Sequence, residues 1–150
     1  MTILVAISIW GMGASAINTC NYSFCDIQYI MKGIITMEIK FYEDQNGNVP
    51  VREFLDSLDI KMRLKMLRSI QALQDMGISL RMPLSEALND GIFELRAKVG
   101  TDISRVMYFF VVGNQAVLTH GFVKKTQKTP PREIERAKKL RDDYVKRFVH

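Results

Sequence analysis

The sequence predicts one α+β domain, in which a strand, two helices, three strands and a last helix follow one another. Three observations lead to this prediction. Apolar residues recur every three or four positions in residues 50–76 and again after residue 130, as on one face of a helix. Three runs between residues 92 and 124 are rich in β-branched and aromatic residues and are separated by glycine-containing turns. The chain has 150 residues, 47% of them hydrophobic and 25% charged, which is enough to bury one core.

The first half of this order consists of one strand and two helices. Residues 38–42 alternate polar and apolar side chains, as an opening strand does, and turn residues follow at 44–48. Pro50 stands near the first turn of a short helix, whose apolar stripe is Val51, Phe54, Leu55 and Leu58. A longer helix is expected to end at the cap residue Gly77. Its predicted buried stripe recurs at helical spacing: Ile60, Leu64, Leu67, Ile70 and Leu73.

The second half consists of a connector, three strands and a helix. Residues 78–91 form an irregular connector, with one helical turn expected at Ser85 to Leu88. The three predicted strands are Ile92–Val99, Ile103–Val112 and Gln115–Lys124. Because short hairpin-type links join them, the sheet is expected to be an antiparallel meander. The last helix is expected to follow Thr129 as its N-cap, with prolines at its opening.

Side-chain direction along the strands indicates which groups reach solvent. In the first strand of the meander, the apolar residues share one face, so Glu94, Arg96 and Lys98 form a polar, wet face. In the third strand, both faces are largely apolar, which predicts a central strand. Strict alternation places His120 on one face with Ala116, Leu118, Phe122 and Lys124. His120 is therefore expected to be partly sheltered.

The net charge of +5 belongs to residues 37–150, because the only charged residues before Met37 are Asp26 and Lys32. A surplus of positive charge favours the binding of polyanions such as RNA through counterion release. Such a surplus is also common on proteins in which it only contributes to solubility. Charge therefore supports a nucleic-acid partner without proving one.

Residues 1–36 do not resemble a part of this domain. They contain Cys20, Cys25 and Trp10 and an apolar run from Ile3 to Ile9, without helical periodicity or caps. A signal peptide would explain the run and the small residues at 14–16, but no Lys or Arg precedes the run. A membrane span is excluded, because glycine and polar residues interrupt the run before it reaches roughly 20 residues.

We favour a third interpretation, in which translation starts at Met37 and residues 1–36 are a non-native extension. Lys32 and Gly33 require the codons AA(A/G)GGN, which resemble a bacterial ribosome-binding site and lie three codons ahead of Met37. The domain is then residues 37–150. It contains no cysteine, which fits a reducing cytoplasm.

Cationic and imidazole side chains accumulate in the predicted sheet, at Arg96, Arg105, His120, Lys124 and Lys125. Cleavage of RNA without a metal requires a proton to leave the ribose 2′-OH, a phosphorane to be stabilised and the departing 5′ oxygen to be protonated. The arginines and lysines can stabilise the charge, and His120 can exchange protons near neutral pH.

Further candidates complete the predicted site. Tyr108 is a weaker candidate for the proton transfers, and the basic residues expected to contact RNA are Lys98, Lys128, Arg132 and Arg136. The sequence has no cluster of Asp, Glu, His or Cys at metal-ligand spacing, so neither a metal nor another cofactor is expected.

Each of these candidates also has a structural interpretation. A single histidine in a strand is more often structural than catalytic. Arg96 can pair with Glu94 or with a carboxylate on a neighbouring strand. The lysines after the third strand, and the basic residues of the last helix, can belong to a solvated surface.

Three segments resemble a known family: Gly91-Ile92-Phe93-Glu94-Leu95-Arg96, then Arg105 with Tyr108-Phe109-Phe110, and then residues 120–130, His-Gly-Phe-Val-Lys-Lys-Thr-Gln-Lys-Thr-Pro. Together with the helix after them, they strongly resemble RelE/HigB-type toxins, in particular the phage-derived subgroup. The resemblance spans residues 37–150. Its start, Met37-Glu38-Ile39, is where such proteins typically begin, which supports the start-site hypothesis.

The resemblance implies a βααβββ-type sheet with a C-terminal helix, in which the antiparallel sheet packs against the N-terminal helices. It further implies a type II toxin that cleaves mRNA on the translating ribosome and inhibits translation in the cytoplasm. The partner would be a small antitoxin with a helix-turn-helix domain, encoded by an adjacent gene.

The sequence also departs from the family pattern. RelE-type members have a catalytic tyrosine after the basic residues of the last strand, whereas residues 126–131 contain none. HigB-type members depend more on histidine and lysine, which are present. The assignment of general acid and general base therefore stays open. Two other functions stay open as well: an inactive module of the same fold that binds RNA or the antitoxin, and a secreted basic protein.

Overall fold

The structure is a computed structural model that describes residues 36–124 and 128–149. The elements follow one another as β1 (Glu38–Phe41), α3 (Pro50–Ser57), α4 (Ile60–Met76), the 3₁₀ turn η2 (Gly77–Ser79), β2 (Ser85–Ala87), β3 (Ile92–Val99), β4 (Asp102–Val111), β5 (Gln115–Lys124) and α5 (Pro131–Phe148). This order confirms the predicted α+β class. The prediction that residues 1–36 are an extension falls outside the described residues, apart from Thr36.

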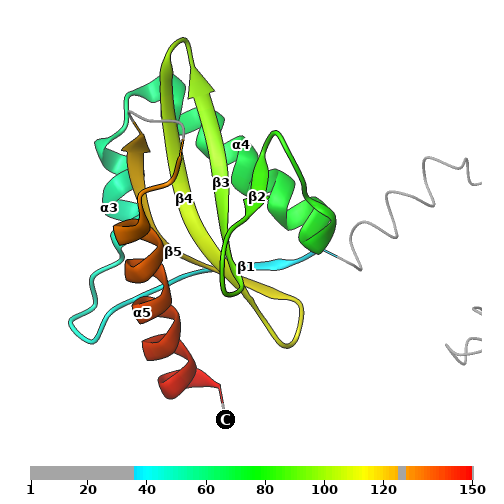
Figure 1. Cartoon of the computed structure of the whole chain (residues 1–150), viewed down its shortest axis with the longest axis vertical. Helices are drawn as coiled ribbons and strands as arrows, with labels where there is room; N and C mark the ends of the chain where they lie inside the picture. Colours follow the sequence, from blue (N-terminus) through cyan, green and yellow to red (C-terminus); the bar gives the residue numbers. More distant parts are fainter. Residues whose placement is uncertain (1–35, 125–127, 150) are drawn as a thin grey trace, which may run out of the picture. The chain divides into compact units, whose positions relative to one another are not determined.

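One five-stranded sheet has the strand order β1-β5-β4-β3-β2. The three long strands form the predicted antiparallel meander, and β1 pairs in parallel with β5. β5 lies between β1 and β4 and is therefore a central strand. This confirms the prediction made from the two largely apolar faces of β5. Figure 1 shows β1 running along the sheet beside β5.

The expected helical turn at Ser85 to Leu88 is wrong, because these residues begin with the edge strand β2. Ser85 pairs with Leu95, and Ala87 pairs with Phe93. The Ser85 hydroxyl is buried and lies 2.7 Å from the hydroxyl of Tyr108 in β4. A three-residue strand is too short to show an alternating pattern, so its conformation follows from pairing with β3.

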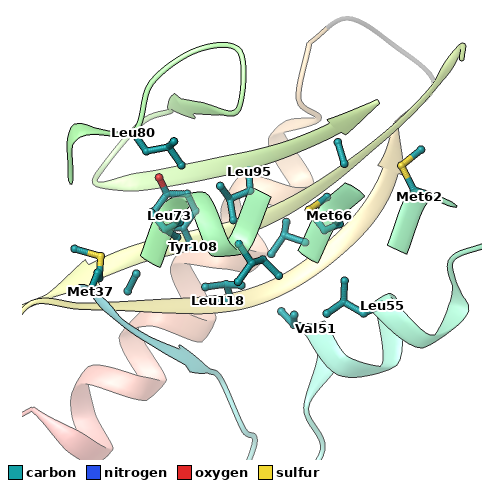
Figure 2. Packing of buried hydrophobic residues seen from close by; sticks show 14 residues of the cluster. Met37, Val51, Leu55, Met62, Met66, Leu73, Leu80, Leu95, Tyr108 and Leu118 are labelled. Carbon is teal, nitrogen blue, oxygen red and sulfur yellow. The ribbon is translucent and has the colours of Figure 1, made fainter. Parts of the chain in front are cut away.

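The two helices before the meander pack on one face of the sheet, and α5 packs on the other (Figure 1). The first core includes Val51, Leu73, Leu95 and Leu118, which Figure 2 shows between the helices and the sheet. The second core is made by α5 residues such as Ala137 and Tyr144 against β3, β4 and β5. The sheet is therefore covered on both faces.

The buried stripe of α4 differs from the predicted one in the first half of the helix. Ile60 and Leu64 are 72% and 52% exposed, and Leu67 is also exposed. The side chains that enter the core there are Met62 and Met66 (Figure 2). Two apolar stripes lie about 200° apart in this segment, and periodicity could not tell which of them faces the sheet. The second half, Ile70 and Leu73, is buried as predicted, and Gly77 is the C-terminal cap.

A bulge in β5 changes the face of the sheet on which His120 lies. Met107 pairs with His120, but the next residue of β4, Tyr108, pairs with Leu118, so Thr119 is the extra residue. Leu118 consequently faces α4, whereas His120 contacts α5. The prediction that both share one face is wrong, because strict alternation ends at a bulge.

Gly121 allows α3 to approach β5 closely. A Cβ atom at this position would lie 1.9 Å from the Phe54 ring, far inside van der Waals contact. The absent side chain therefore makes room for the ring, and Gly121 fixes where α3 lies on the sheet.

Candidate functional site

Arg96 and Arg105 are direct cross-strand partners on β3 and β4. Both side chains lie on the face of the sheet that carries α5, because Arg105 has the same parity as Met107 and Phe109 of the second core. Arg96 is partly exposed, whereas Arg105 is buried. Burial, and then the positive charge of Arg105, lower the pKa of the Arg96 guanidinium.

The carboxylate of Glu94 lies between the two arginines and is 0% exposed. Arg96 donates to its Oε1 from Nε at 2.8 Å, and the second Arg96 contact to Oε1 measures 2.7 Å. Arg105 donates to the same oxygen. The predicted wet face of β3 is therefore wrong for Glu94, because two guanidinium groups and the segment before α5 cover it.

Thr129 ties the segment before α5 to this cluster. Its hydroxyl donates to Glu94 at 2.5 Å and accepts from Arg105 at 2.6 Å. The predicted N-cap role of Thr129 is wrong: Pro130 occupies the cap position, and α5 begins at Pro131. These hydrogen bonds fix Thr129, two residues before α5, beside the arginine pair.

Two cavities meet at the arginine pair. The first, the Thr129 cleft, has a volume of about 430 Å³ and is lined by Glu86, Leu88, Arg96, Arg105, Lys128, Thr129 and Ile134. The second, the Met82 pocket, has a volume of about 320 Å³. Its apolar lining is Met82, Pro83, Leu84, Ala97 and Ile103. Its polar lining is entirely cationic: Lys65, Arg96, Lys98 and Arg105.

Arg96 separates these cavities. One terminal nitrogen of its guanidinium lies 3.1 Å from the Met82 sulfur in the pocket, and the other pairs with Glu86 in the cleft. Glu86 belongs to β2 and its side chain is 42% exposed. Arg96 thus has the carboxylate partners that its structural interpretation expected, one of them at the solvent boundary.

His120 lies beneath the first turn of α5 and is 1% exposed. Its Nε2 donates to Glu133 at 3.1 Å, and its Nδ1 lies 3.2 Å from the Thr119 hydroxyl. Burial, and then the charge of Arg136, lower the pKa of His120 to about 4. The imidazole is therefore neutral at physiological pH and holds α5 against β5. It lines neither cavity.

Tyr108 lies on the opposite face of the sheet from the arginines, in the core beneath α4. Its hydroxyl is paired with Ser85, and burial raises its pKa. The structure therefore does not bring Tyr108 together with the arginines.

Two of the basic candidates line the cavities at the arginine pair. Lys98 lines the pocket and Lys128 lines the cleft, and both are exposed. Lys124 ends β5 opposite Ile103, while Lys125 lies outside the described residues. On α5, Arg132 and Arg136 are exposed, and Arg132 lies 3.3 Å from Glu133.

Three members of the site were missed by sequence reasoning: Lys65, Glu86 and Thr129. Glu94 was expected as a possible partner of Arg96, from its position two residues before Arg96 on the same strand face, and the structure has this contact. Lys65 and Glu86 had no such signal, since α4 and β2 reach the site only through tertiary packing.

A protein-family model matches more than half of the chain. The model described as "Phage derived protein Gp49-like (DUF891)" matches residues 53–142, which include α4, the arginine pair and most of α5. The chain belongs to the phage-derived Gp49-like family. This family is associated with RelE-like toxins. Its members, and therefore this chain, are toxin-like modules of toxin–antitoxin systems. No curated protein matches the sequence.

Two further observations concern this Gp49-like protein. Within residues 36–124 and 128–149, no three His, Cys, Asp or Glu side chains gather in a group that could hold a metal ion. Among the helices in the described part of the chain, none has the length and hydropathy needed to cross a membrane.

Proposed function

We propose that the protein is the toxin of a type II toxin–antitoxin system and cleaves mRNA on the translating ribosome. The observation that supports this most directly is the cross-strand pair Arg96 and Arg105 at the junction of two cavities. Paired guanidinium groups suit a phosphodiester, because each can donate two parallel hydrogen bonds to it. The cavities on either side leave room for the nucleotides before and after that phosphate.

The proposed reaction is a transesterification within the RNA. The ribose 2′-OH loses its proton and its oxygen attacks the adjacent phosphorus. The bond from phosphorus to the 5′ oxygen then breaks, and that oxygen takes up a proton. The products are a 2′,3′-cyclic phosphate and a 5′-hydroxyl. Arg96 and Arg105 stabilise the negative charge of the phosphorane between these steps.

The described geometry favours different roles for the other candidates. His120, neutral and covered by α5, acts as a positioning residue. We assign the proton transfers to two lysines that the sequence singled out. Lys124 and Lys125 are the proposed groups, and Lys128 contacts RNA in the cleft. Arg132 and Arg136 extend this basic surface along α5.

The decisive experiment is primer extension on an mRNA that has been incubated with the protein in a translation mixture, either with ribosomes or with the ribosomes left out. We expect cleavage only with ribosomes, and a loss of about 100-fold or more in Arg96→Ala, a loss typical of removing one group that stabilises a transition state. Lys146→Ala is the matched control, because it removes the same charge near the far end of α5. Equal cleavage without ribosomes would contradict the ribosome requirement.

An inactive RNA- or antitoxin-binding module is the second candidate. Its support is the pairing of both arginines with carboxylates, which opposes phosphate binding. Growth arrest in cells that persists unchanged in an Arg96→Ala, Arg105→Lys double variant would favour this candidate over the nuclease.

We further propose a small helix-turn-helix antitoxin as the partner and the cytoplasm as the site of action, where the ribosomes are. A helix-turn-helix gene directly beside this one supports the partner. Recovery of the mature chain outside the cytoplasm would instead support the secreted alternative.

A further inference from the structure

The Met82 pocket has a chemistry that the Thr129 cleft lacks. Five of its nine lining residues are apolar and the other four are cationic, whereas the cleft contains the carboxylate Glu86. A ligand that fits it carries a compact apolar body with a negative charge at its edge. A nucleobase attached to a phosphate has this form.

The position of the cations favours a nucleotide over a fatty acid. Lys65 projects from α4 and Lys98 from β3, so the positive charges come from two elements around the pocket. The pocket also shares the arginine pair with the Thr129 cleft. A chain with a phosphate at every unit can occupy both cavities, whereas a fatty acid has one anionic end.

We propose that the Met82 pocket binds the nucleobase of the nucleotide next to the phosphate held by Arg96 and Arg105. This inference rests on the proposed function and adds a base subsite to it. Met82 and Ile103 contact the base, and Lys65 and Lys98 attract the neighbouring phosphates. Lys65 is thereby assigned to RNA binding.

The subsite is tested by NMR on the full chain with isotope-labelled methionine and isoleucine methyl groups. The probes are adenosine 5′-monophosphate, uridine 5′-monophosphate and ribose 5-phosphate. We expect both nucleotides to shift the methyl signals of Met82 and Ile103 and to bind about tenfold more tightly than ribose 5-phosphate, because the base adds its own contacts. Met76, which is about as exposed as Met82, and Ile78 are internal controls, since they line neither cavity.

Two matched variants sharpen the test. Met82→Glu places a carboxylate in the pocket and is expected to weaken adenosine monophosphate binding about fivefold or more. Met76→Glu makes the same change at a similarly exposed methionine and is expected to leave binding unchanged. Both positions are more than half exposed, so neither variant buries its new charge.

Three results would overturn the subsite: equal affinity for ribose 5-phosphate and the nucleotides, shifts at Met82 and Ile103 no larger than at the control methyls, or the same shifts with decanoate as with a nucleotide. None of them bears on mRNA cleavage, which primer extension measures separately. Nucleotide binding without cleavage would instead retain the subsite and contradict the nuclease.

Discussion

At the residue scale, the carboxylates around Arg96 and Arg105 determine whether these arginines can bind an anion. Glu94 is enclosed and holds Arg96, Arg105 and Thr129 together, so it organises the site. Glu86 differs, because its carboxylate reaches solvent while it pairs with Arg96. We therefore expect an incoming phosphate to compete with Glu86 for Arg96 and to leave the contact with Glu94 in place.

Replacing Glu86 by glutamine is expected to strengthen RNA binding. The change keeps the shape of the side chain and removes the competing charge. Since exposed ion pairs contribute roughly 0.2–1 kcal/mol, we expect an affinity about two to five times higher. Fluorescence anisotropy with a short single-stranded RNA measures it. Unchanged or weaker binding would mean that Glu86 does not compete with phosphate.

His120 is expected to make stability depend on pH. Its pKa is about 4 in the folded protein and near 6.5 unfolded, so between these values the unfolded chain binds more protons. Stability therefore falls as pH drops from 6.5 to 4, by on the order of 3 kcal/mol in total. Urea unfolding at several pH values should show this loss in the wild type, and His120→Gln should lack this component.

Retained mRNA cleavage in His120→Gln would agree with a positioning role. A pH profile that loses an ionisation near neutrality in this variant would instead show that His120 exchanges protons during the reaction.

Gly121 is expected to tolerate no side chain. Alanine there collides with the Phe54 ring, and forced overpacking costs about 1–3 kcal/mol of unfolding free energy. Thermal or urea unfolding measures the loss. The same substitution made together with Phe54→Ala should cost clearly less, because the ring has been removed. An equal cost in both backgrounds would place the strain elsewhere.

At the element scale, substitutions in α4 test which of its two apolar stripes faces the sheet. Met66→Ala is expected to cost about 2–5 kcal/mol of unfolding free energy, because Met66 is fully buried. Leu64→Ala removes a similar side chain from the exposed stripe and should change stability by less than about 0.5 kcal/mol. Urea unfolding of the two variants compares them, and a reversed order would restore the stripe predicted from sequence.

The elements that sequence predicted well have strong local signals. Pro50 and Gly77 lie at the predicted helix ends, and the three long strands were bounded by their turns. The errors lie where contacts with another element determine the local structure. The choice between two apolar stripes of α4, the pairing that makes β2 and the bulge at Thr119 each depend on a neighbouring element.

The site was predictable to the same extent. Arg96 and Arg105 were selected from sequence, and strand pairing places them side by side. Sequence could not reveal that Glu94 would be enclosed between them or that Lys65 would reach the same pocket. Nor could it show that His120 would be covered by α5, because the bulge that turns it there has no sequence pattern.

At the scale of the whole molecule, Met37, the predicted first residue of the domain, belongs to the core. Met37 is buried in the first core, as Figure 2 shows, and its N–H donates to the carbonyl of Gln74 at 2.8 Å. Its side chain also lies against Gly77 at the end of α4. The structured domain therefore needs Met37, whichever residue starts translation.

A protein that begins at Met37 is accordingly expected to be as stable as the full chain. Its Tm should agree within about 2 °C, which corresponds to less than about 1 kcal/mol for a domain of this size. Removing residues 37–39 as well deletes the buried methionine and should lower the Tm by several times that amount. Mass spectrometry of the protein from its native host tests the start site itself. Peptides from residues 1–36 would contradict a start at Met37, whereas an intact mass for residues 37–150 would support it.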